Sequence, residues 1–518
     1  MSDFPILTLL TLTPLLGGLM VLGVQSQNQR AARTVALVTT LASLALAGLL
    51  WAKFDRTATG LQFGELADWI PTLGVQYHLG VDGLGLPMVL LSAILVPMAL
   101  LVSWRLTDRP GLYFGLMLLL ESGLFGAFTA LNFFHWFLFW ELSLIPAFFL
   151  IKLWGGPNRG PAATQFFVYT MAGSVALLLA FLAVGLVTGT FNFIKLAEMG
   201  RSGELNGLLA STLGWKFLTG QQLSVIIFLG AFLGFAVKVP VWPFHTWQPA
   251  TYAEAPTSTT MLLTGAMSKM GVYGFLRILL PIFPEPARLV LKPLLILAVA
   301  TIVFSAFAAF AQRDLKRMLA YSSMNHLGYC LLGMFAAMRS TGFAGEMALD
   351  KVAALNGVML QMFNHGITAA TLFCFVAFLE NRSGGLRGLH DFGGLRKPAP
   401  VFAGLMGIAI FASIGLPGLS GFVGEFLIFK GAFTLATWPT AIATLGLLLT
   451  AVFLLTLIQR VFAGPVNPRW EKFPDLTTGE RLLVLPGLAL IFALGVWPQA
   501  LVGVLNTYSL QFAGWMNF

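Results

Sequence analysis

The segment GFAVKVPVWPFHTWQP, residues 234–249, places one lysine and three prolines inside an apolar stretch of the chain. Proline removes a backbone donor and clashes with the preceding helical turn, so the segment predicts a broken helix. A second segment, ASIGLPGLSGFVGEF at residues 412–426, combines one proline with four glycines and predicts another break. At membrane depth, irregular backbone is tolerated only where protein or a water-filled cavity satisfies the freed polar groups.

The composition places these breaks in a membrane protein. Hydrophobic residues occupy 57% of the 518 positions, charged residues occupy 10%, and the mean hydropathy is +0.84. About a quarter of the residues of a soluble protein are charged, so most of this surface must face lipid. The net charge of +9 fits the basic bias of cytoplasmic loops better than nucleic-acid binding. Cys330 and Cys374 lie in apolar stretches and predict neither a disulfide nor a zinc site.

Apolar stretches of about twenty residues recur along the chain, and each is long enough to cross a hydrocarbon core of about 30 Å. They predict an all-α polytopic fold with about fourteen transmembrane helices. Their centres lie near residues 15, 43, 93, 121, 142, 175, 230, 268, 300, 326, 366, 414, 449 and 493. The breaks fall in spans 7 and 12, five apart. Spans 4–8 and 9–13 are therefore predicted to be repeats, and their odd length makes the two copies inverted.

This pattern divides the chain into four regions. Residues 1–110 hold the first three helices, residues 111–281 the first repeat, residues 282–465 the second repeat, and residues 466–518 a fourteenth helix. Of the Lys and Arg residues outside the spans, seventeen follow odd-numbered spans and eleven follow even-numbered spans. The positive-inside bias therefore predicts odd-numbered loops in the cytoplasm and both termini outside it.

Four charged residues stand inside apolar spans, where each costs about 2.5–3.5 kcal/mol on insertion scales. They are Glu141, Lys238, Lys269 and Glu425. Burial lowers the pKa of a lysine and raises that of a carboxyl group, and a nearby opposite charge does the reverse. A buried lysine whose carboxylate partner moves can therefore take up and release a proton, and Glu141 with Lys238 is the candidate pair. The alternative is a static ion pair that locks two helices together.

Two histidines, His326 and His365, lie in spans 10 and 11. Imidazole titrates closest to neutrality and suits a proton relay, although a histidine in a protein core can be purely structural. Neighbouring polar side chains could hold water in the same interior: Ser322, Ser323, Asn325, Asn364 and Thr368. The sequence has no phosphate loop, dinucleotide fingerprint, CxxC spacing or zinc motif, so no cofactor is expected on this chain. An ion gradient or a partner must then supply the energy.

Long motifs resemble those of the antiporter-like subunits of respiratory complex I, and most of all subunit M of NADH–quinone oxidoreductase. They are WELSLIPAFFLI (140–151), FAVKVPVWPFHTWQPATYAEAPTSTTMLLTGAMSKMGVYGFLR (235–277), QRDLKRMLAYSSMNHLGY (312–329), FNHGITAATLF (363–373) and GLPGLSGFVGEF (415–426). The EAPT segment at 254–257 and Glu425 favour subunit M, because subunit L carries a lysine near that last position. Subunit L also has a long C-terminal lateral helix, for which the residues after span 14 leave no room.

The resemblance implies a fourteen-helix fold with discontinuous helices 7 and 12, and a proton path through the membrane. Glu141 would pair with Lys238, Lys269 would stand at the centre, His326 and His365 would bridge, and Glu425 would lie on the exit side. Quinone reduction in partner subunits would drive the path, and those partners would hold quinone and iron–sulfur clusters, with or without flavin. The other membrane-arm subunits would be direct partners, in a bacterial cytoplasmic membrane or a thylakoid membrane.

Two positions depart from the family pattern. The family commonly has a WLPDAH-type run where this chain reads WQPATY, so Gln248 and Ala250 replace a leucine and an aspartate. This puts in question any role of that acidic group. Ser268 precedes Lys269 where an apolar residue is usual, and it could hydrogen-bond the helix or alter the hydration of the lysine.

Three other functions use the same motifs or the same charges. One is a subunit of an Mrp-type cation/proton antiporter, which would transport sodium without quinone. Another is a related membrane hydrogenase module or a cyanobacterial complex specialised for carbon dioxide uptake. The third is a membrane scaffold in which the buried charges only fix helix packing.

Overall fold

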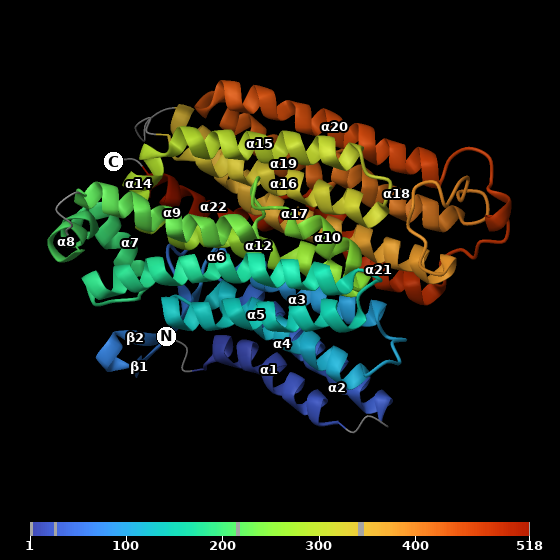
Figure 1. The fold of residues 1–518 in the computed structure, drawn as a ribbon, viewed down its shortest axis with the longest axis horizontal. Coiled ribbons are helices and arrows are strands. Elements are labelled where there is room, and N and C mark those ends of the chain that lie inside the picture. Colours follow the sequence, from blue (N-terminus) through green and yellow to red (C-terminus); the bar gives the residue numbers. More distant parts are fainter. Residues whose placement is uncertain (1–3, 25–27, 214–217, 340–345, 517–518) are drawn as a thin grey trace.

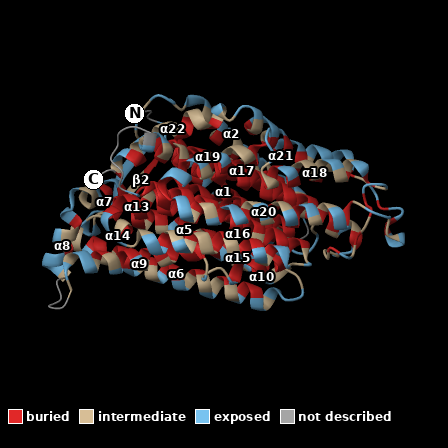
Figure 2. Cartoon of the chain, turned by 90° about the horizontal axis from the view of Figure 1, so that it is seen from above, coloured by how far each residue is buried: buried red, intermediate tan, exposed pale blue. Residues whose placement is uncertain are grey.

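The computed structural model describes the chain except residues 1–3, 25–27, 214–217, 340–345 and 517–518. It is a long helical bundle whose helices run nearly along one axis (Figure 1). Within the described residues, eleven helices are long and apolar enough to cross a membrane. Leu186, Trp438 and Val496 are 78%, 79% and 77% exposed, so large apolar side chains face outward. Buried residues fill the middle of the bundle (Figure 2), as a lipid-facing exterior requires.

The first region holds three helices and a hairpin. The helices are α1 (Ile6–Gly23), α2 (Gln29–Lys53) and α3 (Gly85–Val102). Between α2 and α3, strands β1 (Gln62–Ile70) and β2 (Val75–Val81) pair antiparallel around the short turn η1 (Pro71–Leu73). The predicted helical fold is confirmed, but the hairpin is an addition to it. Glu65 accepts hydrogen bonds from the amide groups of Leu7 and Thr8, which fixes the hairpin to the first turn of α1.

The first repeat contains the predicted break in span 7. Its helices are α4 (Pro110–Thr129), α5 (Phe133–Trp154), α6 (Arg159–Thr188), α7 (Phe193–Ser202), α8 (Glu204–Leu213), α9 (Gly220–Lys238) and α10 (Trp247–Glu254). Helix α9 starts at a capping box, in which Thr219 and Gln222 bond each other's backbone amides. It ends at Lys238, and residues 239–246 with Pro240 and Pro243 form the break before α10.

Span 8 contains two π turns, which the sequence did not indicate. It comprises α11 (Thr257–Leu262), η2 (Leu263–Met267), α12 (Lys269–Gly274), η3 (Phe275–Leu279) and α13 (Leu280–Ile282). The amide of Ser268 bonds the carbonyl of Leu263, five residues back, instead of that of Thr264. The carbonyl of Thr264 therefore loses its usual α-helical partner and is free to accept bonds from side chains.

The second repeat contains the predicted break in span 12. Its helices are α14 (Pro284–Leu289), α15 (Leu291–Phe310), α16 (Leu315–Ala337), α17 (Glu346–Ser383), α18 (Pro400–Ile414), α19 (Ser420–Leu435) and α20 (Thr437–Val461). Gly415 and Gly418 adopt φ angles of +85° and +92° between α18 and α19, where a side chain would be strained. In Figure 1 the pair α9–α10 runs opposite to the pair α18–α19, as inverted repeats require.

Residues 466–518 hold two helices where the sequence predicted one. After the short turn η4 (Pro468–Trp470) come α21 (Thr478–Val496) and α22 (Gln499–Trp515). Pro498 separates them, because the residue before a proline disfavours helical geometry. The Tyr508 hydroxyl donates to the carbonyl of Leu276 at 2.8 Å, so α22 packs onto the end of span 8. The start of α1 and the end of α22 lie at this end of the bundle (Figure 1).

Close backbone contact joins α17 to α19. A Cβ atom added to Gly357 would lie 2.6 Å from the amide nitrogen of Ile428, and one added to Gly431 would lie 2.3 Å from the carbonyl oxygen of Asp350. Real Cβ atoms do not approach this closely, so either substitution must push the two helices apart. This contact positions α17 and α19, which carry two of the predicted site residues.

We therefore expect Gly357→Val to lower stability by about 1–3 kcal/mol, the usual cost of overpacking a tight interior. The apparent melting temperature of the purified protein in mild detergent measures this effect. Gly407→Val on α18 is the matched control, because a Cβ atom there meets nothing within 4 Å. Equal melting temperatures for the two variants would contradict the proposed helix contact.

Candidate functional site

Lys269 and His365 form one buried hydrogen-bonded unit. The Nζ atom of Lys269, at the start of α12, lies 2.7 Å from Nδ1 of His365 on α17. It also donates to the carbonyl of Thr264, which the π turn leaves free, and lies 3.4 Å from Oγ of Ser268. Ser268 itself donates to the Thr264 carbonyl at 2.9 Å. The serine that departs from the family pattern thus contacts both the helix backbone and the lysine.

His326 and Glu425 form a second unit. Nδ1 of His326 on α16 lies 3.0 Å from Oε1 of Glu425 on α19. Its other ring nitrogen, Nε2, lies 3.2 Å from Oγ of Ser413, at the end of α18. The side-chain amide of Gln361 on α17 donates to Oε1 of Glu425 at 3.2 Å. Every side chain in this unit is buried, so its hydrogen bonds are shielded from solvent.

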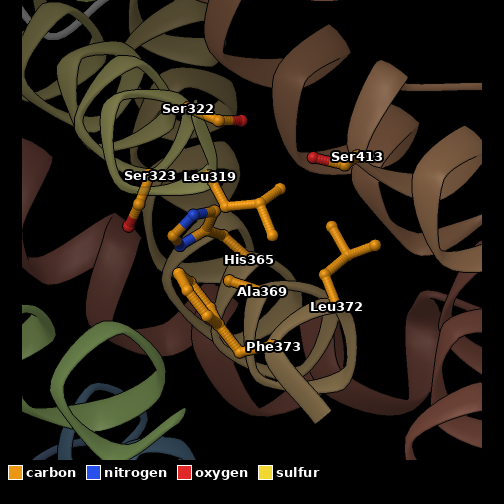
Figure 3. Close-up of a pocket in the computed structure, with 8 residues that line it drawn as sticks. All are labelled: Leu319, Ser322, Ser323, His365, Ala369, Leu372, Phe373 and Ser413. Atoms are coloured by element: carbon orange, nitrogen blue, oxygen red, sulfur yellow. The ribbon is translucent and has the colours of Figure 1, made fainter. Parts of the chain in front are cut away.

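Two small cavities lie beside the two histidines. The ring centroids of His326 and His365 are 5.1 Å apart, and among the described atoms no hydrogen bond joins the rings. One cavity is lined by His365 together with Ser322, Ser323 and Ser413 (Figure 3). The other cavity is lined by both histidines, Ser413 and Glu425. Each cavity is small, with room for about one water molecule that would have several polar partners.

Glu141 and Lys238 lie in a separate group. Lys238 is buried at the end of α9, where its Nζ atom lies 3.4 Å from Oγ of Ser143 and 4.6 Å from the ring centre of Trp140. Both residues are in the described part of the chain, yet no ion pair joins them. Oε1 of Glu141 is buried without a hydrogen-bond partner among the described residues. Glu141 lies on α5 and Lys238 on α9, so the structure holds the two members of the predicted pair as separate groups.

The EAPT segment anchors a charged network at one end of the bundle. Arg387 lies 3.2 Å from Glu254 and 2.6 Å from Asp314, and Glu254 also accepts the backbone amide of Asn158 at 2.9 Å. Lys316 is buried, and its Nζ atom donates to the carbonyl of Ala255 at 2.6 Å. These contacts tie the end of α10 to the ends of α6, α16 and α17, and so connect the two repeats.

The structure thus brings together two pairs of the six predicted residues, Lys269 with His365 and His326 with Glu425, whereas Glu141 and Lys238 lie apart on α5 and α9. Three further buried polar residues were not predicted. Gln361 and Ser413 look like ordinary polar residues in sequence, although Ser413 lies directly before the break in span 12. Glu121 is a third omission, and its signal was visible, because it is a lone carboxylate in the apolar run LLLESGLF of span 4.

The side chains of the six residues are two amines, two imidazoles and two carboxyl groups, and each of these can bind and release a proton. Across the described residues there is no group of three or more His, Cys, Asp or Glu residues placed to hold a metal ion. The arrangement is therefore suited to proton transfer between neighbouring side chains and water.

Comparisons with known proteins agree with this architecture. Residues 130–451 match the family model described as NADH:quinone oxidoreductase/Mrp antiporter, TM. NADH-quinone oxidoreductase subunit M of Rhodobacter capsulatus is 36% identical over 507 residues, which cover 97% of this chain and 95% of that protein. F(420)H(2) dehydrogenase subunit M of Methanosarcina mazei is 34% identical, with 95% of each chain covered.

Among solved structures, a chain of the respiratory complex I of Thermus thermophilus with bound NADH superposes with a TM-score of 0.85. It is 29% identical, and the match covers 99% of this chain and 100% of that one. The family match, the extent of the sequence similarity and the shared fold agree. This chain is an integral, multi-pass membrane protein that belongs to the NADH:quinone oxidoreductase/Mrp antiporter family.

Proposed function

We propose that this chain is a proton-translocating membrane-arm subunit of a quinone-reducing complex I. The observation that carries the proposal is the pair of buried units, Lys269 with His365 and His326 with Glu425, on either side of cavities with room for water. Proton-carrying groups are costly inside a membrane, and here four of them from four spans converge on one path. A scaffold needs neither the cavities nor two imidazoles between a lysine and a carboxylate.

The first step is transfer from Lys269 to His365. As an ammonium ion, Lys269 donates a proton to Nδ1 of His365, 2.7 Å away, and becomes a neutral amine. The Thr264 carbonyl holds the Nζ atom in place throughout, because the π turn gives it no competing α-helical amide. Imidazole suits the receiving position, since its two nitrogens can bind one proton and release another.

The second step carries the proton from His365 to Glu425. The rings are too far apart for a direct bond, so a water in the shared cavity passes the proton to His326. His326 then gives its Nδ1 proton to Oε1 of Glu425 at 3.0 Å. Ser413, at the other ring nitrogen, can accept or donate a hydrogen bond, so it tolerates both forms of the histidine.

Glu141 and Lys238 would control this path. In the structure Glu141 stands apart from Lys238, and the ammonium group relies on Ser143 and the Trp140 ring. Movement of Glu141 toward Lys238 would stabilise the charged lysine, and movement away would favour release of its proton. Lys238 lies at the end of the broken helix, where a small change in the 239–246 segment alters its position.

Partner subunits would supply the driving force and the redox cofactors, namely quinone and iron–sulfur clusters, with or without flavin. Relatives whose names specify different donors, NADH and F(420)H(2), are almost equally similar to this chain. This supports the proposal that partner subunits determine the electron donor, which would include NAD(P)H or ferredoxin. We further propose a bacterial cytoplasmic or a thylakoid membrane, with both termini outside the cytoplasm, because seventeen Lys and Arg residues follow odd-numbered spans and eleven follow even-numbered spans.

The four regions proposed from the sequence also serve this function. The charged pair Glu141 and Lys238 belongs to residues 111–281, whereas His326, His365 and Glu425 belong to residues 282–465. Lys269 lies in the first repeat but bonds His365 in the second repeat. The hydrogen bond between Lys269 and His365 is therefore the point at which a proton would pass from one repeat to the other.

The central test is Lys269→Met in the assembled complex reconstituted into vesicles. The rate of proton translocation should fall at least about tenfold, because loss of a charge-assisted hydrogen bond of about 1.5–3 kcal/mol corresponds to roughly a tenfold to hundredfold change. Proton uptake and quinone reduction are measured together. Lys397→Met, at an exposed lysine outside the spans, is the control and should behave as wild type. Normal translocation by an assembled Lys269→Met complex would refute the path.

A second test separates the pump from the Mrp-type antiporter or hydrogenase module that shares this family. The tagged chain is purified in mild detergent, and its partners are identified by mass spectrometry. We expect iron–sulfur and quinone-site subunits, together with other antiporter-like subunits. Small membrane partners without any redox subunit, combined with sodium-dependent proton exchange in vesicles, would instead support the antiporter.

A further inference from the structure

Glu121 is a buried charge-bearing group that the proposed path does not use. It lies in the middle of α4 and is 0% exposed. Neither of its carboxyl oxygens makes a hydrogen bond with any described residue. An ionised carboxylate without a partner costs several kcal/mol in an apolar interior, whereas the neutral acid costs much less. Glu121 therefore retains its proton at rest, and it needs a function to justify its position.

Two hydrogen bonds fix α4 against span 8. The hydroxyl groups of Tyr113 and Ser258 lie 2.6 Å apart, and the Tyr273 hydroxyl donates to the carbonyl of Phe128 at 3.1 Å. In each bond the two residues are 145 positions apart in the sequence, so α4 and span 8 run parallel. A residue of α4 therefore lies level with the residue 145 positions later in span 8. The same offset places Glu121 level with Ala266. Ala266 belongs to the π turn whose free carbonyl, that of Thr264, binds the ammonium group of Lys269.

Glu121 also faces span 8. At about 100° per residue, it lies about 80° from Tyr113 and about 20° from Phe128 around the axis of α4. Both of those residues contact span 8, so Glu121 belongs to the same narrow stripe of the helix. Helices α4 and α12 are in direct contact, as this placement requires.

The opposite face of α4 leads to the Lys238 group. A Cβ atom added to Gly123 would lie 2.7 Å from the backbone nitrogen of Ser143, so α4 and α5 touch there. Ser143 is the residue whose hydroxyl lies nearest to the ammonium group of Lys238. Gly123, which packs against Ser143, is only two residues after Glu121 on α4. Glu121 and Ser143 therefore lie at nearly the same height along the bundle. Glu121 stands at the gap between the Lys238 group and the Lys269 group.

Few other titratable groups face this position. Helices α1 and α3, both fully described, pack on α4 and contain no titratable side chain. Helix α2 carries Arg30, Arg33 and Lys53 near its ends. The titratable residues of the remaining helices against α4 are His135, Glu141 and Lys152 on α5, and Lys269 and Tyr273 on α12. Of these, Lys269 lies closest to the level of Glu121.

We propose that Glu121 is a further proton-transfer residue, which carries protons between Lys238 and Lys269. The neutral acid gives its O–H proton, through water, to the amine of Lys269, which becomes an ammonium ion. The resulting carboxylate takes a proton from the ammonium group of Lys238, which becomes neutral. Only O–H and N–H bonds form and break, and the charge moves from one lysine to the other. This inference rests on the proposed function and adds a residue to its path.

The decisive variant is Glu121→Gln, because the amide has nearly the shape of the neutral acid but cannot release a proton. In the assembled complex we expect proton translocation at least about tenfold slower than wild type, with an unchanged melting temperature. Glu121→Asp keeps a carboxyl group and should restore part of the rate. Glu471→Gln, at an exposed glutamate outside the spans, is the control and should leave translocation unchanged. A structural filler would lose nothing in Glu121→Gln.

Infrared difference spectroscopy gives a second readout that does not depend on pumping. Wild type should show the carbonyl band of a protonated carboxyl group, shifted by deuterium exchange, and Glu121→Gln should lack it. Absence of that band in wild type, or normal translocation by Glu121→Gln, would overturn the inference. If Lys269→Met blocks translocation while Glu121→Gln does not, this inference alone fails. If both variants translocate normally, the proposed function fails as well.

Discussion

Every backbone polar group inside a membrane needs a partner, and this constraint governs both the breaks and the site. At the break in span 7, the carbonyls of Ala236 and Val237 are satisfied by the amide of Val241 and the indole of Trp247, at 2.7 Å and 3.0 Å. At the break in span 12, the side chain of Asn364 donates to the carbonyl of Ser420 at 2.6 Å. The π turn of span 8 follows the same rule, since its freed Thr264 carbonyl accepts Lys269. Irregular backbone and buried charge thus stabilise each other.

The sequence was sufficient for the fold, but not for the contacts that the buried charged residues make. Pro240, Pro243 and Pro417 marked both breaks, and hydropathy indicated a helical protein with many spans, because each signal is local. The β1–β2 hairpin and α22 escaped notice because they lie outside the apolar runs. The bond between Lys269 and His365 depends on helix rotation and on a π turn that no residue pattern specifies. The same holds for Gln361 and Ser413, whose role arises from packing, whereas Glu121 could have been recognised as a charge inside an apolar run.

The spacing of the groups has a functional meaning. The polar atoms of Lys269 and His365 lie 2.7 Å apart and those of His326 and Glu425 lie 3.0 Å apart, whereas these two pairs and Lys238 are not hydrogen-bonded to one another in the described structure. A continuous chain of bonds would let protons run down their gradient without doing work. Groups that connect only when water enters, or when a side chain moves, allow transfer to be coupled to events elsewhere in a complex. The small size of the cavities keeps this connection dependent on one or two water molecules.

Helix α17 has 38 residues and is therefore about 57 Å long, nearly twice the hydrocarbon thickness of about 30 Å. It holds Asn356, which bonds Asn506 of α22, near one end, and Arg382, which pairs with Glu480 of α21, near the other. His365 lies between these anchors. Because side-chain bonds hold it near both ends, α17 forms one rigid connection between α22 and α21. Movement of α22 would be transmitted along this helix to His365 and to the ion pair of Arg382 with Glu480, without any change in the helix itself.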